Sequence, residues 1–214
     1  MRGIRAVFFD VAHTLLGKPA VLPAMRATLA QHGIDVPLDE LRARHVLLME
    51  SIEFPDRTDG NFYRGFNAAL VRAVGGVPTE ALLDALFAAS TYRPWVPYPD
   101  TVALDSLGLP CGVLSNWDET LQERLDGLPG PGFRWILGSA EQRIRKPDPR
   151  FFGLIPERTG LQASDIAYVG DSMRLDIEPA TKLGFRAILV DRDSVFPHSP
   201  VPRITSLAQL EDLL

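Results

Sequence analysis

This 214-residue sequence has one cysteine, no long apolar run and no excess of basic residues, and each shortage argues against a class of protein. The lone Cys111 can form neither an intramolecular disulfide nor a zinc site with a second cysteine, which favours a reducing compartment such as the cytoplasm. No apolar stretch approaches the roughly 20 residues of a membrane-spanning helix, and the one at residues 6–9 is too short for a secretory signal. The excess of 27 acidic over 22 basic residues argues against nonspecific binding to nucleic acid or to an anionic membrane.

What is present is an ordinary globular composition, with 46% apolar and 23% charged residues, and a short repeated pattern. Apolar runs rich in β-formers are separated, except once, by helix-like stretches of roughly 10 to 20 residues, which predicts parallel strands joined by crossover helices. The runs occupy residues 4–10, 111–115, 133–138, 166–169 and 186–190. We therefore expect an α/β protein with a Rossmann-like parallel sheet.

The long gap between the first two runs predicts a second domain. Within it, apolar residues recur at helical spacing in four segments, which are separated by breaks rich in glycine and proline. Residues 93–100 contain three prolines and predict an extended return to the sheet. We therefore expect an inserted all-helical domain of four helices at residues 17–98 and an α/β core formed by residues 1–16 and 99–214.

Polar residues lie where three of the predicted strands end. Asp10 closes the first, Ser115–Asn116 close the second, and Asp171 follows the fourth. Ligands of open α/β sheets bind just outside such carboxyl ends. Each feature alone also has a simpler structural explanation, because acids cap turns and Ser115–Asn116 can cap a helix whose first turn carries Asp118.

Lys146 adds a positive charge to this set. The Asp148 that follows it is a good N-cap and Pro149 a good first helical residue, so both predict a helix start. They do not account for Lys146. Only three of the 22 basic residues are lysines and 19 are arginines, so a lysine here suggests a need for a compact point charge. Because the carboxyl ends of parallel strands share one sheet edge, these polar groups together predict a site for a phosphate group and a hard divalent cation.

The order of these motifs, with a helical insertion after the first, resembles the haloacid dehalogenase-like hydrolase superfamily in its helical-cap branch. The resemblance covers essentially the whole chain and includes Gly-Asp-Ser-Met-Arg-Leu-Asp at residues 170–176. It implies a phosphatase in which Asp10 attacks phosphorus and Lys146 neutralises the nucleophile and the phosphate. Ser115 and Asn116 are implied to hold the transferred group.

The same resemblance implies Mg²⁺ as cofactor and a small phosphorylated metabolite as substrate. Asp10, Asp171 and the main-chain carbonyl of Ala12 are the implied metal ligands. Asp176 is the implied outer partner of the metal's water ligands or of Lys146. These assignments agree with the need of phosphoryl transfer for positioning and charge neutralisation.

The sequence departs from the family at Ala12, where phosphatases of this kind usually carry a second aspartate that protonates the leaving group. Loss of a general acid–base group costs about 10²–10⁴ in rate, which predicts slow or restricted activity toward alkyl phosphates. Aryl or acyl phosphates, whose leaving groups are stable anions, are affected less. The neighbouring His13 is a poor replacement, because in an extended chain its side chain faces away from that of Ala12.

Three alternatives compete with a slow phosphatase. A non-catalytic relative would keep the pocket and bind a phosphate ligand or a protein partner. The second alternative is a dehalogenase. The resemblance implies a metal-free site for such relatives, and a site of that kind would not need Asp171. A phosphonate hydrolase resembles the sequence in having alanine at position 12, but it uses a cap lysine, and Lys18 is the only lysine before Lys146. In the insertion, Arg57, Tyr63 and Arg64 are candidates for selecting the leaving group.

Overall fold

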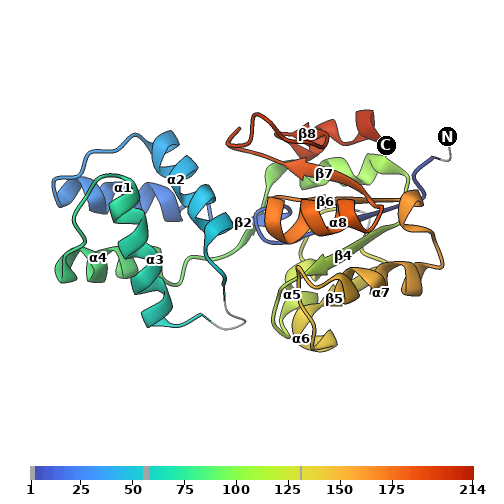
Figure 1. Cartoon of the computed structure of the whole chain (residues 1–214), viewed down its shortest axis with the longest axis horizontal. Helices are drawn as coiled ribbons and strands as arrows, with labels where there is room; N and C mark the ends of the chain where they lie inside the picture. Colours follow the sequence, from blue (N-terminus) through green and yellow to red (C-terminus); the bar gives the residue numbers. More distant parts are fainter. Residues whose placement is uncertain (1–2, 55–57, 131) are drawn as a thin grey trace. The chain divides into compact units, whose positions relative to one another are not determined.

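The computed structural model describes residues 3–54, 58–130 and 132–214 and divides the chain into two compact units (Figure 1). The first unit contains Met1–Gly17 and Pro97–Leu214, and the second contains Lys18–Val96. Short strands β2 (Leu16–Gly17) and β3 (Val96–Pro97) pair where the chain passes from one unit to the other.

A six-stranded parallel sheet with the order β5-β4-β1-β6-β7-β8 forms the centre of the first unit, which confirms the predicted fold class. Its strands are β1 (Ala6–Phe9), β4 (Cys111–Ser115), β5 (Trp135–Gly138), β6 (Ile166–Gly170), β7 (Arg186–Val190) and β8 (Arg203–Ile204). The first five coincide with the predicted apolar runs, because strands buried on both faces need continuous apolar sequence. Strand β8 has no counterpart among the predicted apolar runs, because it has only two residues and lies at the sheet edge.

Helical elements lie between these strands and after the last of them. They are η1 (Pro99–Leu107), α5 (Leu121–Asp126), α6 (Ser139–Gln142), α7 (Pro149–Thr159), η2 (Ala163–Asp165), η3 (Met173–Ile177), α8 (Glu178–Lys182), η4 (Leu207–Gln209) and η5 (Glu211–Leu213). Phe151 and Phe152 of α7 and Ala180 of α8 pack with Phe8 and Tyr168 of the sheet in one buried cluster. This layer covers one face of the sheet.

Local sequence sets where several helices start. The Asp148 carboxylate accepts a hydrogen bond from the Arg150 amide, and Pro149 is the first residue of α7, as predicted. The expected extended segment 93–100 is shorter than predicted, because η1 already begins at Pro99. Proline suits the first turn of a helix, where its missing N–H leaves no bond unmade.

The second unit is helical, with α1 (Val21–Gln31), α2 (Leu38–Ser51), α3 (Gly60–Ala73) and α4 (Glu80–Ser90). Met25, Leu29, Leu70, Leu82 and Leu86 lie in its own buried core. The side chains of Asp59 and Thr79 cap α3 and α4. This unit therefore has an apolar core separate from that of the sheet.

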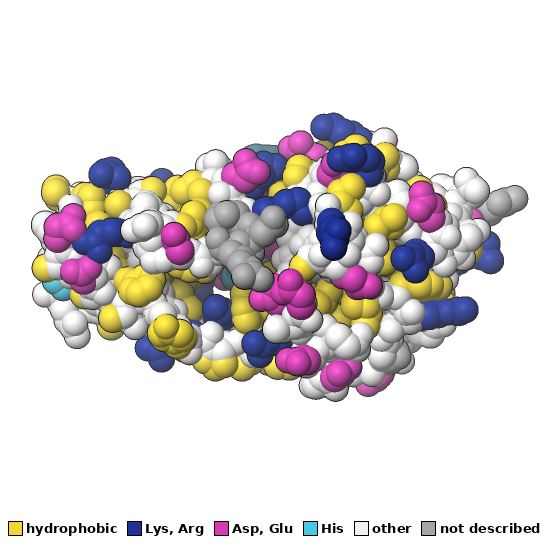
Figure 2. All heavy atoms as spheres, turned by 90° about the horizontal axis from the view of Figure 1, so that it is seen from below, with side chains coloured by type: hydrophobic (Ala, Val, Ile, Leu, Met, Phe, Trp, Pro, Cys, Tyr) yellow, Lys and Arg dark blue, Asp and Glu magenta, His cyan; other side chains and the backbone are white. Residues whose placement is uncertain are grey.

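Among the described residues, no helix is both long and apolar enough to cross a membrane. Figure 2 shows basic and acidic side chains interspersed on the face that it draws.

Candidate functional site

The strand register brings the predicted polar residues to one edge of the sheet. Strand β1 lies between β4 and β6, and Phe9 pairs with Val113 on one side and Val169 on the other. Strand β6 ends one residue beyond this level, at Gly170, and β4 two residues beyond it, at Ser115, so Asp10 leaves β1 close to both ends. Asp171 directly follows β6, so the two acids start from neighbouring strand ends.

Lys146 lies at the centre of this edge and joins two acids. Its Nζ donates to Oδ1 of Asp10 and to Oδ1 of Asp176, each at 2.6 Å. All three residues are buried, with 4% or less of their surface exposed. Burial opposes the charge of Lys146, but the two carboxylates outweigh this effect and hold its pKa above its usual value. Ser115 Oγ also donates to Oδ1 of Asp10, at 3.0 Å.

Asp176 is fixed by contacts to both of its carboxylate oxygens. Oδ1 also contacts the Tyr168 hydroxyl at 3.1 Å, and Oδ2 accepts from the Ser172 amide at 3.1 Å. A Cβ at Gly170 would overlap the Asp176 carboxyl, so only glycine permits this approach. Burial raises the pKa of Asp176 to about 6, Asp10 adds to the rise and Lys146 opposes it.

The carboxylates of Asp10, Asp171 and Asp176 form a cluster that suits a divalent cation. One oxygen of each lies within 4.8 Å of the others. When ionised, the three acids together with Lys146 carry two net negative charges, and carboxylate oxygens are the ligands that Mg²⁺ prefers. Oδ1 of Asp171 accepts a hydrogen bond from Thr14 Oγ1 at 3.3 Å, which links Asp171 to the loop after β1.

Asn116 does not cap a helix. Its side chain bonds the main chain of Lys146 instead. Its amide nitrogen donates to the Lys146 carbonyl at 3.1 Å and its amide oxygen accepts from the Lys146 amide at 2.8 Å. The prediction that a helix starts directly after Asn116 is wrong, because α5 begins only at Leu121. Asp118 instead accepts from the amide and hydroxyl of Thr120, which holds an intervening turn.

Ala12 and His13 lie in a tight loop after β1. Ala12 is half-buried and forms an isolated bridge with Leu16, whose carbonyl accepts from the His13 amide. The extended geometry assumed for His13 is wrong, because its φ of 60° is in the left-handed region. Ala12 supplies only main-chain polar groups to this loop.

Two residues near the site, Tyr168 and Arg192, are absent from the residues predicted from the sequence. Tyr168 occupies an apolar run, and nothing in its spacing distinguishes its hydroxyl from that of an ordinary core tyrosine. Arg192 follows β7 by two residues, and this position at a strand end was an unused signal. Its guanidinium donates to the carbonyls of His13 and Thr14.

The candidate specificity residues of the second unit have partners within that unit. Arg64 pairs with Glu80 and with Asp84, and Tyr63 contacts the Thr58 hydroxyl. Arg57 lies outside the described residues. Lys18 lies 4.8 Å from the centre of a tryptophan ring, that of Trp95.

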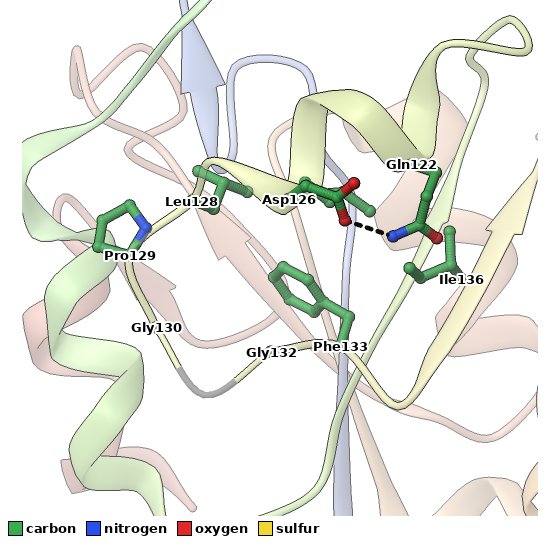
Figure 3. Close-up of a pocket in the computed structure, with 9 residues that line it drawn as sticks. Gln122, Asp126, Leu128, Pro129, Gly130, Gly132, Phe133 and Ile136 are labelled. Carbon is green, nitrogen blue, oxygen red and sulfur yellow. Dashed lines mark hydrogen bonds between the residues drawn. The ribbon is translucent and has the colours of Figure 1, made fainter.

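A separate pocket of about 420 Å³ lies beside α5 and β5 (Figure 3). Phe133 and Ile136 supply apolar walls, and the Gln122 amide donates to Asp126 at 2.7 Å. These two polar side chains of the lining therefore pair with each other. The pocket shares no residue with the carboxylate cluster.

The chain is similar to known proteins of one family. Residues 4–184 match the model of the haloacid dehalogenase-like hydrolase family. The chain is 35% identical over 154 residues to haloacid dehalogenase-like hydrolase domain-containing protein 3 of Danio rerio, an alignment covering 64% of this chain and 62% of that protein. It therefore spans less than two thirds of that relative.

Two further similarities extend over more of the chain. Glyceraldehyde 3-phosphate phosphatase of Methanopyrus kandleri is 25% identical over 202 residues, which cover 88% of this chain and 84% of that protein. The crystal structure of 2-haloacid dehalogenase from Pseudomonas syringae pv. Tomato DC3000 superposes with a TM-score of 0.57 and 26% identity, covering 98% and 97% of the two chains. Because the family model spans most of its length, this protein belongs to the haloacid dehalogenase-like hydrolases.

Proposed function

We propose that the protein is a Mg²⁺-dependent phosphatase that hydrolyses small phosphate esters or acyl phosphates through an aspartyl-phosphate on Asp10. The observation that carries the proposal is the buried Lys146 bridging Asp10 and Asp176, with Asp171 in the same cluster. A nucleophilic carboxylate needs nearby positive charge before it can approach an anionic phosphate. The phosphatase named among the relatives supports this choice of reaction.

Asp10, Asp171 and the Ala12 carbonyl are the groups that would hold Mg²⁺. When bound, the ion supplies positive charge that offsets the repulsion between carboxylate and phosphate. Asp176 would act indirectly, because its two oxygens already accept from Lys146 and from the Ser172 amide. It would hold the Lys146 ammonium in place.

In the first step, a carboxylate oxygen of Asp10 forms a bond to phosphorus while the bond from phosphorus to the leaving oxygen breaks. Both hydrogen bonds to the Asp10 carboxylate from Ser115 and Lys146 go to Oδ1, which leaves Oδ2 for the attack. Ser115 would also contact the phosphoryl oxygens. Asn116 would orient Lys146 and offer its second amide N–H to the phosphate. Water then hydrolyses the aspartyl-phosphate and restores Asp10.

Ala12 limits this chemistry, because it has no group to protonate the leaving oxygen or to activate the water. A general acid–base residue is worth about 10²–10⁴ in rate, or about 2.7–5.4 kcal/mol. The leaving group must therefore depart as a stable anion. We expect activity restricted to aryl and acyl phosphates, with slow release of phosphate from Asp10.

The test compares wild type, Asp10→Asn and Ala12→Asp on aryl, acyl and alkyl phosphates, with Mg²⁺ and with chelator. We expect metal-dependent turnover of the aryl and acyl substrates by wild type and none by Asp10→Asn. Ala12→Asp should raise the rate of alkyl phosphate hydrolysis by a factor of about 10²–10⁴. Phosphate release that is equal with chelator, or that survives in Asp10→Asn, would contradict the mechanism.

A second candidate is a non-catalytic protein that binds a phosphate ligand or a partner, and the alanine at position 12 favours it. Calorimetry separates the two, since this function requires binding of a phosphate ester without hydrolysis by wild type. Dehalogenation is a third outcome of the panel, prompted by the Pseudomonas syringae structure. It would show as halide release from a 2-haloacid that persists with chelator.

We further propose that Lys18–Val96 serves as a cap that selects the leaving group, and that the enzyme works in the cytoplasm. The composition supports the compartment, because the single cysteine suits reducing conditions. Tyr63→Ala tests the proposed role of the cap in selecting the leaving group. Across substrates with different leaving groups, this substitution should change KM more than kcat.

A further inference from the structure

Arg192 connects the end of β7 to the loop that follows Asp10. Its Nη2 donates to the Thr14 carbonyl at 2.7 Å and its Nε to the His13 carbonyl at 3.4 Å. Arg192 is separated in the sequence from His13 by 179 positions and from Thr14 by 178. One side chain therefore holds two successive carbonyls of the loop that also carries Ala12.

Arg192 is itself held by Asp100 in a two-point contact. Its Nη1 and Nη2 lie 2.8 and 3.2 Å from the two Asp100 oxygens. Asp100 also accepts from Ser206 Oγ at 2.8 Å and from the Leu207 amide at 2.9 Å. Burial alone would raise the pKa of Asp100, but these donors hold it below its usual value, so it stays ionised at neutral pH.

An aromatic ring completes the support. The Arg192 guanidinium lies 3.7 Å from the centre of the Tyr98 ring, and the Tyr98 amide donates to the Leu15 carbonyl at 3.0 Å. The side chains of Arg192 and Asp100 are 17% and 16% exposed. A stacked, paired and largely buried guanidinium has little freedom to move.

The loop needs such support because its conformation is costly. His13 has a φ of 60°, and residues of this kind persist only where surrounding contacts fix them. The next residue, Thr14, is buried and donates its hydroxyl to Asp171. A shift of the carbonyls at 13 and 14 would therefore move the groups next to the carboxylate cluster.

We propose that Arg192 is a positioning residue that fixes the loop at residues 11–15, and through it the Ala12 carbonyl and the Thr14 hydroxyl beside the metal-binding acids. The metal readout of this inference rests on the proposed function, whereas the loop readout does not. Charge alone is insufficient for this role. A lysine ammonium cannot match the planar fork that contacts two carbonyls and a carboxylate together.

The experiment compares wild type with Arg192→Gln, Arg192→Lys and a matched control, Arg203→Gln. Arg203 is also paired with an acid, Asp191 at 2.8 Å, and its side chain is 32% exposed, but its guanidinium contacts that acid instead of the loop. Hydrogen exchange of the amides at residues 11–16 measures the loop. Calorimetric titration with MgCl₂ measures the metal site, and thermal unfolding verifies that each variant is folded.

We expect both Arg192 variants to exchange these amides at least about tenfold faster and to bind Mg²⁺ about 10–100-fold more weakly, which is the usual effect of losing an outer partner of a metal site. Arg203→Gln should change neither. Exchange within twofold of wild type in folded Arg192→Gln, or full recovery by lysine, would overturn the inference. If wild type binds no Mg²⁺, the proposed function fails and loop exchange alone decides the role of Arg192.

Discussion

Replacing Lys146 by methionine tests whether its buried charge holds the site together. Its Nζ lies 2.6 Å from Asp10 and from Asp176, and the three side chains are between 1% and 6% exposed. Methionine keeps the apolar stem but leaves two acids buried without their cation. Removing one partner of such a pair costs about 3–5 kcal/mol. We expect the free energy of unfolding at pH 7.5 to fall by that amount.

The loss should shrink at lower pH, which identifies its electrostatic origin. Burial raises the pKa of Asp176 to about 6 and Lys146 opposes that rise, so the pKa rises further without the lysine. When the native pKa exceeds the unfolded one, the native state binds more protons between the two values. Lowering the pH through that window therefore stabilises the native state. The variant should approach wild-type stability more closely at pH 5 than at pH 7.5.

Urea unfolding followed by circular dichroism measures both effects. Lys182→Met is the matched control, because Lys182 is 78% exposed and lies 3.9 Å from Glu178. An exposed pair of this kind contributes at most about 1 kcal/mol. Equal losses in the two variants, or a loss in Lys146→Met that does not change with pH, would refute the reasoning.

Three further predictions concern residues in the strands of the sheet. Tyr168→Phe removes a buried hydroxyl that contacts Asp176, so chemical denaturation should show a loss of about 1–3 kcal/mol, and an unchanged stability would contradict this. Gly170→Ala forces a methyl group against the Asp176 carboxyl and should lower Tm, whereas Gly153→Ala, which places its methyl group in open space on a helix, should not. Burial raises the pKa of Cys111 to about 11, so a disulfide reagent at pH 8 should label it far more slowly in the native protein than in urea; equal rates would count against a buried thiol.

Much of the sheet and the placement of the acids could be predicted from the sequence. Apolar runs of four or five residues predict strands buried on both faces, and Asp10 and Asp171 directly follow two of them. Parallel strands end at a common edge, so local order along the chain is enough to bring these acids together. Helix starts such as Asp148–Pro149 are equally local, because the cap bonds to its own helix.

Other features depend on contacts between distant segments, which spacing does not encode. The Tyr168 hydroxyl is indistinguishable from a core residue until the fold places Asp176 beside it. Asn116 bonds the main chain of Lys146, 30 residues away, a partner that no cap motif indicates. Arg192 reaches the loop after β1 only because β7 lies two strands from β1 in the sheet. The sequence by itself therefore determined which residues reach the sheet edge, whereas the tertiary structure decided which hydrogen bonds they make, because those depend on side chains meeting across the fold.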